Sequence, residues 1–202
     1  MEQRSAEWFA ARLGRVTASK VSDVMAKGRS NTPSKTRLNY MMQLMCERLT
    51  GNATQIPVTA AMQRGTVLEP IARAEYESIT ASLVDEVGLV NHPDIEWFAA
   101  SPDGLVDDGL VEIKCPNTAT HIEFIETGKI PSRYKWQMSA QLACTKRAWC
   151  DFASYDDRLP DNLKIKIVRY TPPPSEIEIL EAGIKKFLAE LEDRIRCLTN
   201  TK

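Results

Sequence analysis

The chain has 202 residues, of which 43% are hydrophobic and 26% charged. These proportions are typical of an ordinary globular protein, and the length is enough for one domain with a substantial core. We therefore expect a single domain over 1–202, with its core at about 8–170 and a C-terminal helix at 175–198. The formal net charge of −1 argues against a protein that simply coats nucleic acid, although a local basic groove is compatible with it.

The sequence contains neither a membrane-spanning segment nor a cysteine pattern typical of a metal site. No apolar run approaches the ~20 residues that a membrane helix needs, and the charged first four residues lack the apolar region of a signal peptide. We expect a cytoplasmic protein that does not bind a membrane. The five cysteines contain no CxxC pair, which argues against a zinc site and favours reduced, buried thiols. With His92 and His121 as the sole histidines, carboxylates must carry any chemistry.

The first half of the chain reads as helical, with helices predicted over 6–13, 20–26, 36–50 and 65–78. Ser5 is a candidate N-cap, and Gly14 and Gly51 mark helix ends. The third helix carries an apolar stripe that we expect in the core, formed by Leu38, Met41, Met42, Met45 and Leu49. Residues 1–37 hold eight Lys/Arg against three acids, which fits either a solvated helical face or a local basic groove.

The second half changes to the periodicity of strands. Short β-rich runs predict strands over 84–90, 97–101, 110–114, 149–155 and 164–170, with a helix over 132–145. Three prolines at 172–174 close this region, and the last helix follows. Its apolar stripe fits packing onto the core or onto another subunit, and it comprises Ile177, Leu180, Ile184, Phe187, Leu191, Ile195 and Leu198. The fold class is therefore α/β, a central mixed β-sheet flanked by helices.

Two carboxylates and an amine are predicted to converge beside a hairpin. Asp103 precedes Glu112 by nine residues, and a turn at 107–109 can bring the two together. Because side chains alternate along a strand, Glu112 and Lys114 point the same way while Ile113 points into the core. Carboxylates suit a hard Mg²⁺ ion, and a lysine can orient a water or offset phosphate charge, as phosphodiester hydrolysis requires. A polar turn beside an edge-strand Glu/Lys pair explains the bare pattern as well.

Two further polar side chains sharpen this prediction. Glu69 lies in a helix that is otherwise apolar around it, and an inward-facing acid there is costly unless it is paired or binds a metal. Gln137 shares a helix face with Tyr134 and can donate a hydrogen bond to a phosphate or a water. Taken alone, each fits an exposed surface residue.

Several motifs occur together and in a fixed order. They are R-L-G-R-V-T-A-S-K-V at 12–21, R-G-T-V-L-E at 64–69, S-P-D-G-L at 101–105, V-E-I-K-C-P at 111–116, Y-K-W-Q-M-S-A-Q-L at 134–142 and W-C-D-F-A-S-Y-D at 149–156. This ordered set resembles the YqaJ-like viral recombinase family, to which phage lambda exonuclease belongs, within the PD-(D/E)XK nucleases. The resemblance covers roughly 8–170.

The resemblance implies a restriction-endonuclease-like core and a Mg²⁺-dependent 5′-to-3′ exonuclease that degrades one strand of linear double-stranded DNA and leaves 3′ single-stranded tails for phage-type recombination. It implies two ions, with Mn²⁺ as a substitute, a homotrimer, and a single-strand annealing recombinase as partner in a bacterial host. The residues to which it assigns roles are Asp103, Glu112, Glu69 and the Ile113 carbonyl as metal ligands, Lys114 to position the nucleophile, Gln137 to support the site, and Arg12 and Ser19 to hold the 5′-phosphate.

Departures from the family pattern leave alternatives open. The segment after Pro116 lacks the basic residue of the family and supplies only His121, which fits a phosphate contact or, better, a structural histidine at a helix start. An endonuclease of the same chemistry and a non-catalytic DNA-binding module also remain possible. The presence of Asp103, Glu112 and Lys114 together argues against the non-catalytic module.

Overall fold

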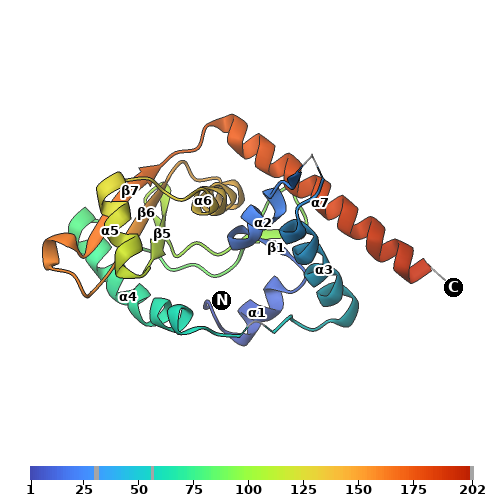
Figure 1. Cartoon of the computed structure of the whole chain (residues 1–202), viewed down its shortest axis with the longest axis horizontal. Helices are drawn as coiled ribbons and strands as arrows, with labels where there is room; N and C mark the ends of the chain where they lie inside the picture. The colour runs from blue at the N-terminus through green and yellow to red at the C-terminus, as the bar shows by residue number, and fades with distance from the viewer. Residues whose placement is uncertain (30–31, 56, 201–202) are drawn as a thin grey trace.

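The computed structural model describes residues 1–29, 32–55 and 57–200. It is a mixed α/β structure in which a four-stranded sheet lies beside a helical body, and the end of a long C-terminal helix projects from that body (Figure 1). The expected fold class is confirmed. The β-structure is divided, however, because a second, three-stranded sheet accompanies the central one.

The four-stranded sheet has the order β4-β5-β6-β7. Its strands are β4 (Gly104–Val106), β5 (Gly109–Lys114), β6 (Cys150–Tyr155) and β7 (Ile165–Tyr170). The β4–β5 pair is antiparallel, β5–β6 is parallel and β6–β7 is antiparallel, so the sheet is mixed. A parallel pair needs a long crossover, and the helices between β5 and β6 supply it.

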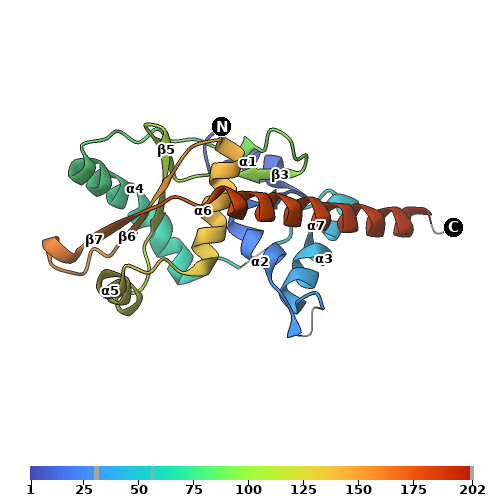
Figure 2. The same ribbon diagram turned by 90° about the horizontal axis from the view of Figure 1, so that it is seen from above.

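Helices cover both faces of this sheet. On one face, Leu68, Ala72 and Tyr76 of α4 (Ala60–Thr80) pack against alternate residues of the strands, among them Val111 and Ile113. On the opposite face, α5 (Thr118–Thr127) and α6 (Ser132–Thr145) pack against Leu110, Cys150 and Phe152 (Figure 2). Because side chains alternate along β5, Glu112 shares the α6 face with Leu110.

The helical body forms around α6 and a small sheet of order β1-β3-β2. Its elements are α1 (Ala6–Arg12), β1 (Val16–Thr17), the 3₁₀ helix η1 (Ala18–Lys20), α2 (Val21–Met25), α3 (Lys35–Thr50), β2 (Val90–Asn91), β3 (Phe98–Ala100) and α7 (Pro174–Asn200). The α7 stripe contributes Leu180, Ile184, Phe187 and Leu191 to this core, whereas Leu198 is exposed. The stripe therefore packs mainly onto its own chain. No helix of the described ranges is long and apolar enough to span a membrane.

Most predicted elements are present within one or two residues of their expected bounds, and α6 matches at both ends. The Ser5 hydroxyl caps α1 by accepting a hydrogen bond from the Trp8 N–H at 3.2 Å. Gly51 ends α3 in the left-handed conformation, with a φ of 69°. These signals act locally, which explains why the sequence reveals them.

Several expectations were wrong. The run 84–90 is not one strand: Asp85 makes a bridge with Leu105, the Gln3 side chain donates to the Val87 carbonyl at 2.8 Å, and only Val90 belongs to a strand, β2. Helix α4 begins at Ala60 and not at about 65. No range was predicted for α5, although a helix start near His121 was considered. In the α3 stripe, Met41 and Met45 are buried, but the other three members are exposed: Leu38, Met42 and Leu49. Thiol burial holds for Cys144 and Cys150, while Cys46 and Cys197 are exposed.

The tip of the β4–β5 hairpin is fastened to the chain that follows α6. The Ala148 N–H donates to the Asp108 carbonyl at 3.1 Å, and the Trp149 indole donates to the Asp108 carboxylate at 2.7 Å. Arg147 adds hydrogen bonds to the carbonyls of Asp107 and Gly109. Gly109 is required here, because a Cβ at this position would lie 2.2 Å from the Trp149 ring.

Candidate active site

Glu112 is the centre of the site. It is fully buried on β5, and its carboxylate faces α6. The Gln137 amide donates to Oε1 at 2.6 Å and the Gln141 amide donates to Oε2 at 2.5 Å, while Lys114 Nζ donates to Oε1. Gln137 and Gln141 are one helical turn apart, so both amides reach the same carboxylate. Three donors therefore fix a buried charge that would otherwise be costly.

Asp103 lies beside Glu112, as the hairpin argument predicted. Its Oδ2 accepts a hydrogen bond from the Ile113 N–H at 2.7 Å, which ties the start of the hairpin to the end of β5. Burial, and then the charge of Glu112, raise the pKa of Asp103 to about 8. Two carboxylates held this close repel each other, and a cation between them would relieve the repulsion.

Lys114 follows on the same face of β5. Burial lowers the pKa of its amine, but the charges of Glu112 and Asp103 outweigh burial, and the pKa is raised. The ammonium group also lies 5.5 Å from the centre of the Tyr134 ring. The amine therefore remains protonated at neutral pH, next to both carboxylates.

Glu69 faces the same site from α4, but arginines already hold it. Arg4 Nη2 lies 2.5 Å from Oε2, and Arg73 Nη2 lies 3.7 Å from Oε1. A cavity of about 550 Å³ has Glu69, Arg4, Ser19 and Lys114 among its lining residues. Glu69 thus faces the site and is paired with arginines. Pairing is one of the two conditions, with metal binding, under which an inward-facing acid is tolerated.

The donor set fits a hard cation held partly by solvent and substrate. Among residues 1–29, 32–55 and 57–200, no three His, Cys, Asp or Glu side chains gather closely enough to hold a metal unaided. Asp103 and Glu112 nevertheless lie together, and burial, followed by the charge of Glu112, raises the pKa of Asp103. Mg²⁺ is commonly bound by one or two carboxylates together with water and substrate phosphates. These two residues, with the Ile113 carbonyl, are those that would hold it.

Ser19 lines the active-site cavity, whereas Arg12 is not among the residues that line it. Arg12 stacks on Trp8, with 4.1 Å from the guanidinium carbon to the ring centre, and its Nη1 lies 3.5 Å from the Ser101 hydroxyl. Ser19 is exposed and lines the cavity with Glu69. Ser19 was expected at the N-terminus of a helix, but it lies within the 3₁₀ turn η1 that precedes α2. Its backbone therefore does not form a helix N-terminal anion site.

Gln141 and Arg4 contact site residues, although no role was predicted for either from the sequence. Gln141 is fully buried in the apolar part of α6, and its distance of four residues from Gln137 was the available signal. Arg4 carries no local signal, because it meets Glu69 from 65 residues away. His121 is structural: it is buried in α5, its Nδ1 lies 2.7 Å from the Ser154 hydroxyl, and its Nε2 lies 2.9 Å from the Leu163 carbonyl.

Comparison with known proteins identifies close relatives of this arrangement. The chain is similar to an alkaline exonuclease of Laribacter hongkongensis, with a TM-score of 0.89. The match covers 96% of this chain and 96% of that one. The identity is 56% in its complex with dAMP and 55% in a second crystal structure. A phage related exonuclease from Haemophilus somnus 129PT shares the fold, with 12% identity, a TM-score of 0.69, and coverage of 92% of this chain and 95% of that one.

A viral relative is longer. The uncharacterized protein R354 of Acanthamoeba polyphaga mimivirus is 26% identical over 231 residues, and the match takes in 100% of this chain but 39% of that protein. The model of the YqaJ-like viral recombinase domain matches residues 7–148, which include Asp103, Glu112, Lys114 and both glutamines. The chain belongs to the YqaJ-like viral recombinase domain family.

Proposed function

We propose that this protein is a Mg²⁺-dependent 5′-to-3′ exonuclease that degrades one strand of linear double-stranded DNA and leaves 3′ single-stranded tails. One observation carries the proposal: Asp103, Glu112 and Lys114 converge at the end of β5, with Glu112 held by the amides of Gln137 and Gln141. The likeness to an alkaline exonuclease over nearly the whole chain supports it.

The residues divide the work of hydrolysis among them. Asp103, Glu112 and the Ile113 carbonyl would hold Mg²⁺, which when bound would supply Lewis-acid activation of the phosphate and of the attacking water. Asp103 and Glu112 supply the negative charge that retains the ion, and the two glutamine amides keep the Glu112 carboxylate oriented. The protonated Lys114 amine donates a hydrogen bond to the water or to a phosphate oxygen as negative charge develops there. For Glu69 to serve a second ion, Arg4 must first leave it.

The 5′ end would be recognised by Arg12 together with Ser19. A guanidinium group suits a phosphate because its donors form a fork, and Trp8 stacks beneath this one. Arg12→Ala should remove most of the preference for a 5′-phosphorylated end over a 5′-hydroxyl end, measured as the ratio of initial rates. Equal rates on both ends in the unaltered protein would contradict this role.

Digestion of one plasmid in closed circular and linear 5′-phosphorylated forms, with and without Mg²⁺, tests the activity. We expect loss of the linear form alone, and no loss with Glu112→Ala, which removes a metal ligand. Circular dichroism of this variant checks that it is folded. Label at the 5′ or the 3′ end then reports polarity. Cutting of the circle would indicate an endonuclease of the same chemistry, and failure to cut either form would leave a non-catalytic DNA-binding module.

The setting of this activity is part of the same proposal. A homotrimer would enclose the DNA, and a single-strand annealing recombinase would receive the 3′ tails. Membership of the YqaJ-like viral recombinase domain family supports this setting. Mn²⁺ should replace Mg²⁺, because it accepts the same oxygen ligands.

A further inference from the structure

The chain before α1, residues 1–5, forms an N-terminal arm that joins two parts of the active site. The Gln3 side-chain amide donates to the Pro102 carbonyl at 2.7 Å, just before the β4–β5 hairpin. The next residue, Arg4, reaches α4, where its Nη2 lies 2.5 Å from Glu69 Oε2. The arm therefore connects the segment that carries the first site carboxylate with the helix that carries the third.

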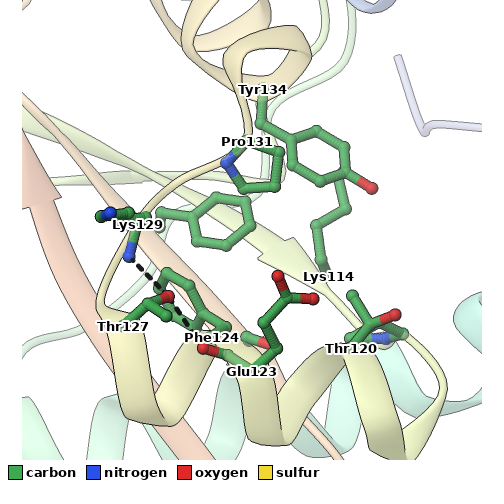
Figure 3. Close-up of a pocket in the computed structure, with 11 residues that line it drawn as sticks. Lys114, Thr120, Glu123, Phe124, Thr127, Lys129, Pro131 and Tyr134 are labelled. Carbon is green, nitrogen blue, oxygen red and sulfur yellow. Dashed lines mark hydrogen bonds between the residues drawn. The ribbon is translucent and has the colours of Figure 1, made fainter.

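Glu69 is the acid that the active-site cavity offers to a further cation. Of the described residues, it is the sole acid among those that line the cavity of about 550 Å³. Glu123 instead lines a second cavity, between α5 and α6, into which its carboxylate points (Figure 3). The charge of Glu69 also contributes to the raised pKa of Asp103, so these two carboxylates interact electrostatically. A second divalent ion beside Asp103 would therefore use Glu69.

Arg4 is the principal partner of Glu69 and is placed where a divalent ion can displace it. The Arg4 side chain is 46% exposed, whereas that of Glu69 is 14% exposed. Arg73 lies farther away, at 3.7 Å from Oε1, and is also paired with Glu86. An ion pair with one exposed member contributes little to stability, and a divalent ion offers the carboxylate twice the charge.

The backbone of Arg4 is unfavourable for a residue with a side chain. Its φ is 67°, in the left-handed region that favours glycine. Such a conformation persists where surrounding contacts compensate for it. The compensating contacts here are the Gln3 hydrogen bonds and the ion pair between Arg4 and Glu69.

We propose that Arg4 is an internal counter-ion that competes with a divalent metal ion for Glu69, so that the N-terminal arm limits how many ions the site holds. While Arg4 contacts Glu69, the site retains one ion, at Asp103 and Glu112. When Arg4 leaves, Glu69 accepts a second ion. The proposal rests on the nuclease function proposed above, which requires these ions.

Titration of the DNA-free protein with Mn²⁺ tests this competition apart from cleavage, because the electron paramagnetic resonance signal reports free Mn²⁺. Unaltered protein should bind one ion per chain more tightly than a second. Arg4→Gly should bind the second ion about fivefold more tightly, the factor expected for loss of a partly exposed ion pair. Glycine suits the backbone at this position, so the arm keeps its conformation.

Three further variants show whether the gain arises at Glu69. Arg4→Lys retains a competing positive charge and should bind Mn²⁺ as the unaltered protein does. Arg196→Gln removes an exposed, ion-paired arginine of α7 and should also leave binding unchanged. In a Glu69→Gln background, Arg4→Gly should give no gain, because the carboxylate for which the two cations compete is absent.

Two results would overturn the competition: equal affinity for the second ion in Arg4→Gly and in the unaltered protein, or a gain that persists in the Glu69→Gln background. Absence of Mg²⁺-dependent DNA digestion alongside the expected titrations would instead overturn the nuclease function and leave the competition at Glu69 standing.

Discussion

At the scale of single residues, the site depends on how Glu112 is held. Gln141 donates to Oε2, yet its own Oε1 is buried without a hydrogen-bond partner in the described residues. An unsatisfied buried oxygen lowers the stability of the fold. The same amide group, through its N–H, keeps the Glu112 carboxylate oriented. The two effects can be separated by substitution.

We expect Gln141→Leu to slow digestion of linear DNA by roughly 10- to 100-fold, the effect of losing one hydrogen bond to a charged group. The Mg²⁺ concentration for half-maximal rate should rise, while the midpoint of thermal unfolding should change little, because removal of the unpaired Gln141 oxygen offsets loss of the hydrogen bond to Glu112. Gln63→Met, on the exposed surface of α4, is the matched control. A lower unfolding midpoint with an unchanged Mg²⁺ requirement would show that Gln141 serves only the fold.

Asp103 gives a prediction about pH. Its pKa is raised from 3.8 to about 8 in the folded protein, so between these values the folded state binds the proton that the unfolded state has lost. Its contribution to stability therefore falls as pH rises from about 4 to about 8. Asparagine at position 103 does not titrate. In EDTA, the unfolding midpoint of Asp103→Asn should therefore exceed that of the unaltered protein by an amount that grows with pH. The difference should reach about 3 °C or more, which corresponds to roughly 1 kcal/mol in a domain of this size.

The same variant should lose the stabilisation that Mg²⁺ gives the unaltered protein, because one of two carboxylates is gone. Differential scanning fluorimetry at pH 5, 7 and 9, in EDTA and in Mg²⁺, measures both effects. An advantage that does not change with pH would mean that Asp103 is ionised throughout.

The sequence predicted Asp103, Glu112 and Lys114 together because they belong to one hairpin, whose alternation and turn act over a dozen residues. Gln137 could be placed on the correct helix face by the same kind of argument. Arg4 could not, since its partner Glu69 is reached only through the tertiary fold.

At the scale of elements, Arg64 joins α4 to the end of β5. Its guanidinium donates to the carbonyls of Cys115 and Pro116 at 3.2 and 3.1 Å, and to the buried Asp156 carboxylate at 2.9 Å. The segment that leaves the active site is thereby fixed between α4 and the chain after β6. Arginine suits this place because its planar fork reaches several acceptors at once.

We expect Arg64→Ala to lower the free energy of unfolding by about 1–3 kcal/mol, because a buried carboxylate loses one of its two arginine partners. Arg64→Lys should recover part of the loss, since one ammonium cannot satisfy acceptors on both segments. Urea unfolding followed by circular dichroism measures both. Arg196→Ala removes an exposed pair with Asp193 and should change stability by less than about 0.5 kcal/mol.

Elements with strong local signals were predictable, and those formed by long-range contacts were not. α6 has a clear helical run, whereas the 84–90 run has the composition of a strand but pairs only at Asp85, through one bridge, and at Val90, in β2. Its backbone instead meets the N-terminal segment, where Gln3 binds the Val87 carbonyl. The α5 segment was read only as a departure from the family motif, although Asn117 caps it by accepting from the Thr120 N–H.

At the scale of the whole molecule, α4 exposes two apolar side chains that do not pack on the sheet. They are Val67 and Ile71, one helical turn apart and each at least half exposed. Exposed apolar side chains that neighbour each other can mark an interface. The proposed homotrimer would cover them, but the packing of one chain does not encode how copies are arranged.

Light scattering after size exclusion should give a mass of three chains for the unaltered protein. Ile71→Asp should shift the mass toward one chain, because a buried charge at an interface is costly, and Lys185→Asp on α7 should not. A single-chain mass for the unaltered protein at micromolar concentration would contradict the trimer. A trimer that tolerates Ile71→Asp would place the interface elsewhere.

The attachment of the hairpin tip to the chain after α6 has a consequence for motion. The β4–β5 hairpin is joined to α6 twice: at the tip through Arg147, Ala148 and Trp149, and at the site through Gln137 and Gln141. Two attachments at opposite ends prevent rotation of one element against the other, so the groups around Glu112 move as one rigid body. Any widening that admits a DNA end must therefore come from the opposite walls, where Arg4 forms an ion pair with Glu69 of α4.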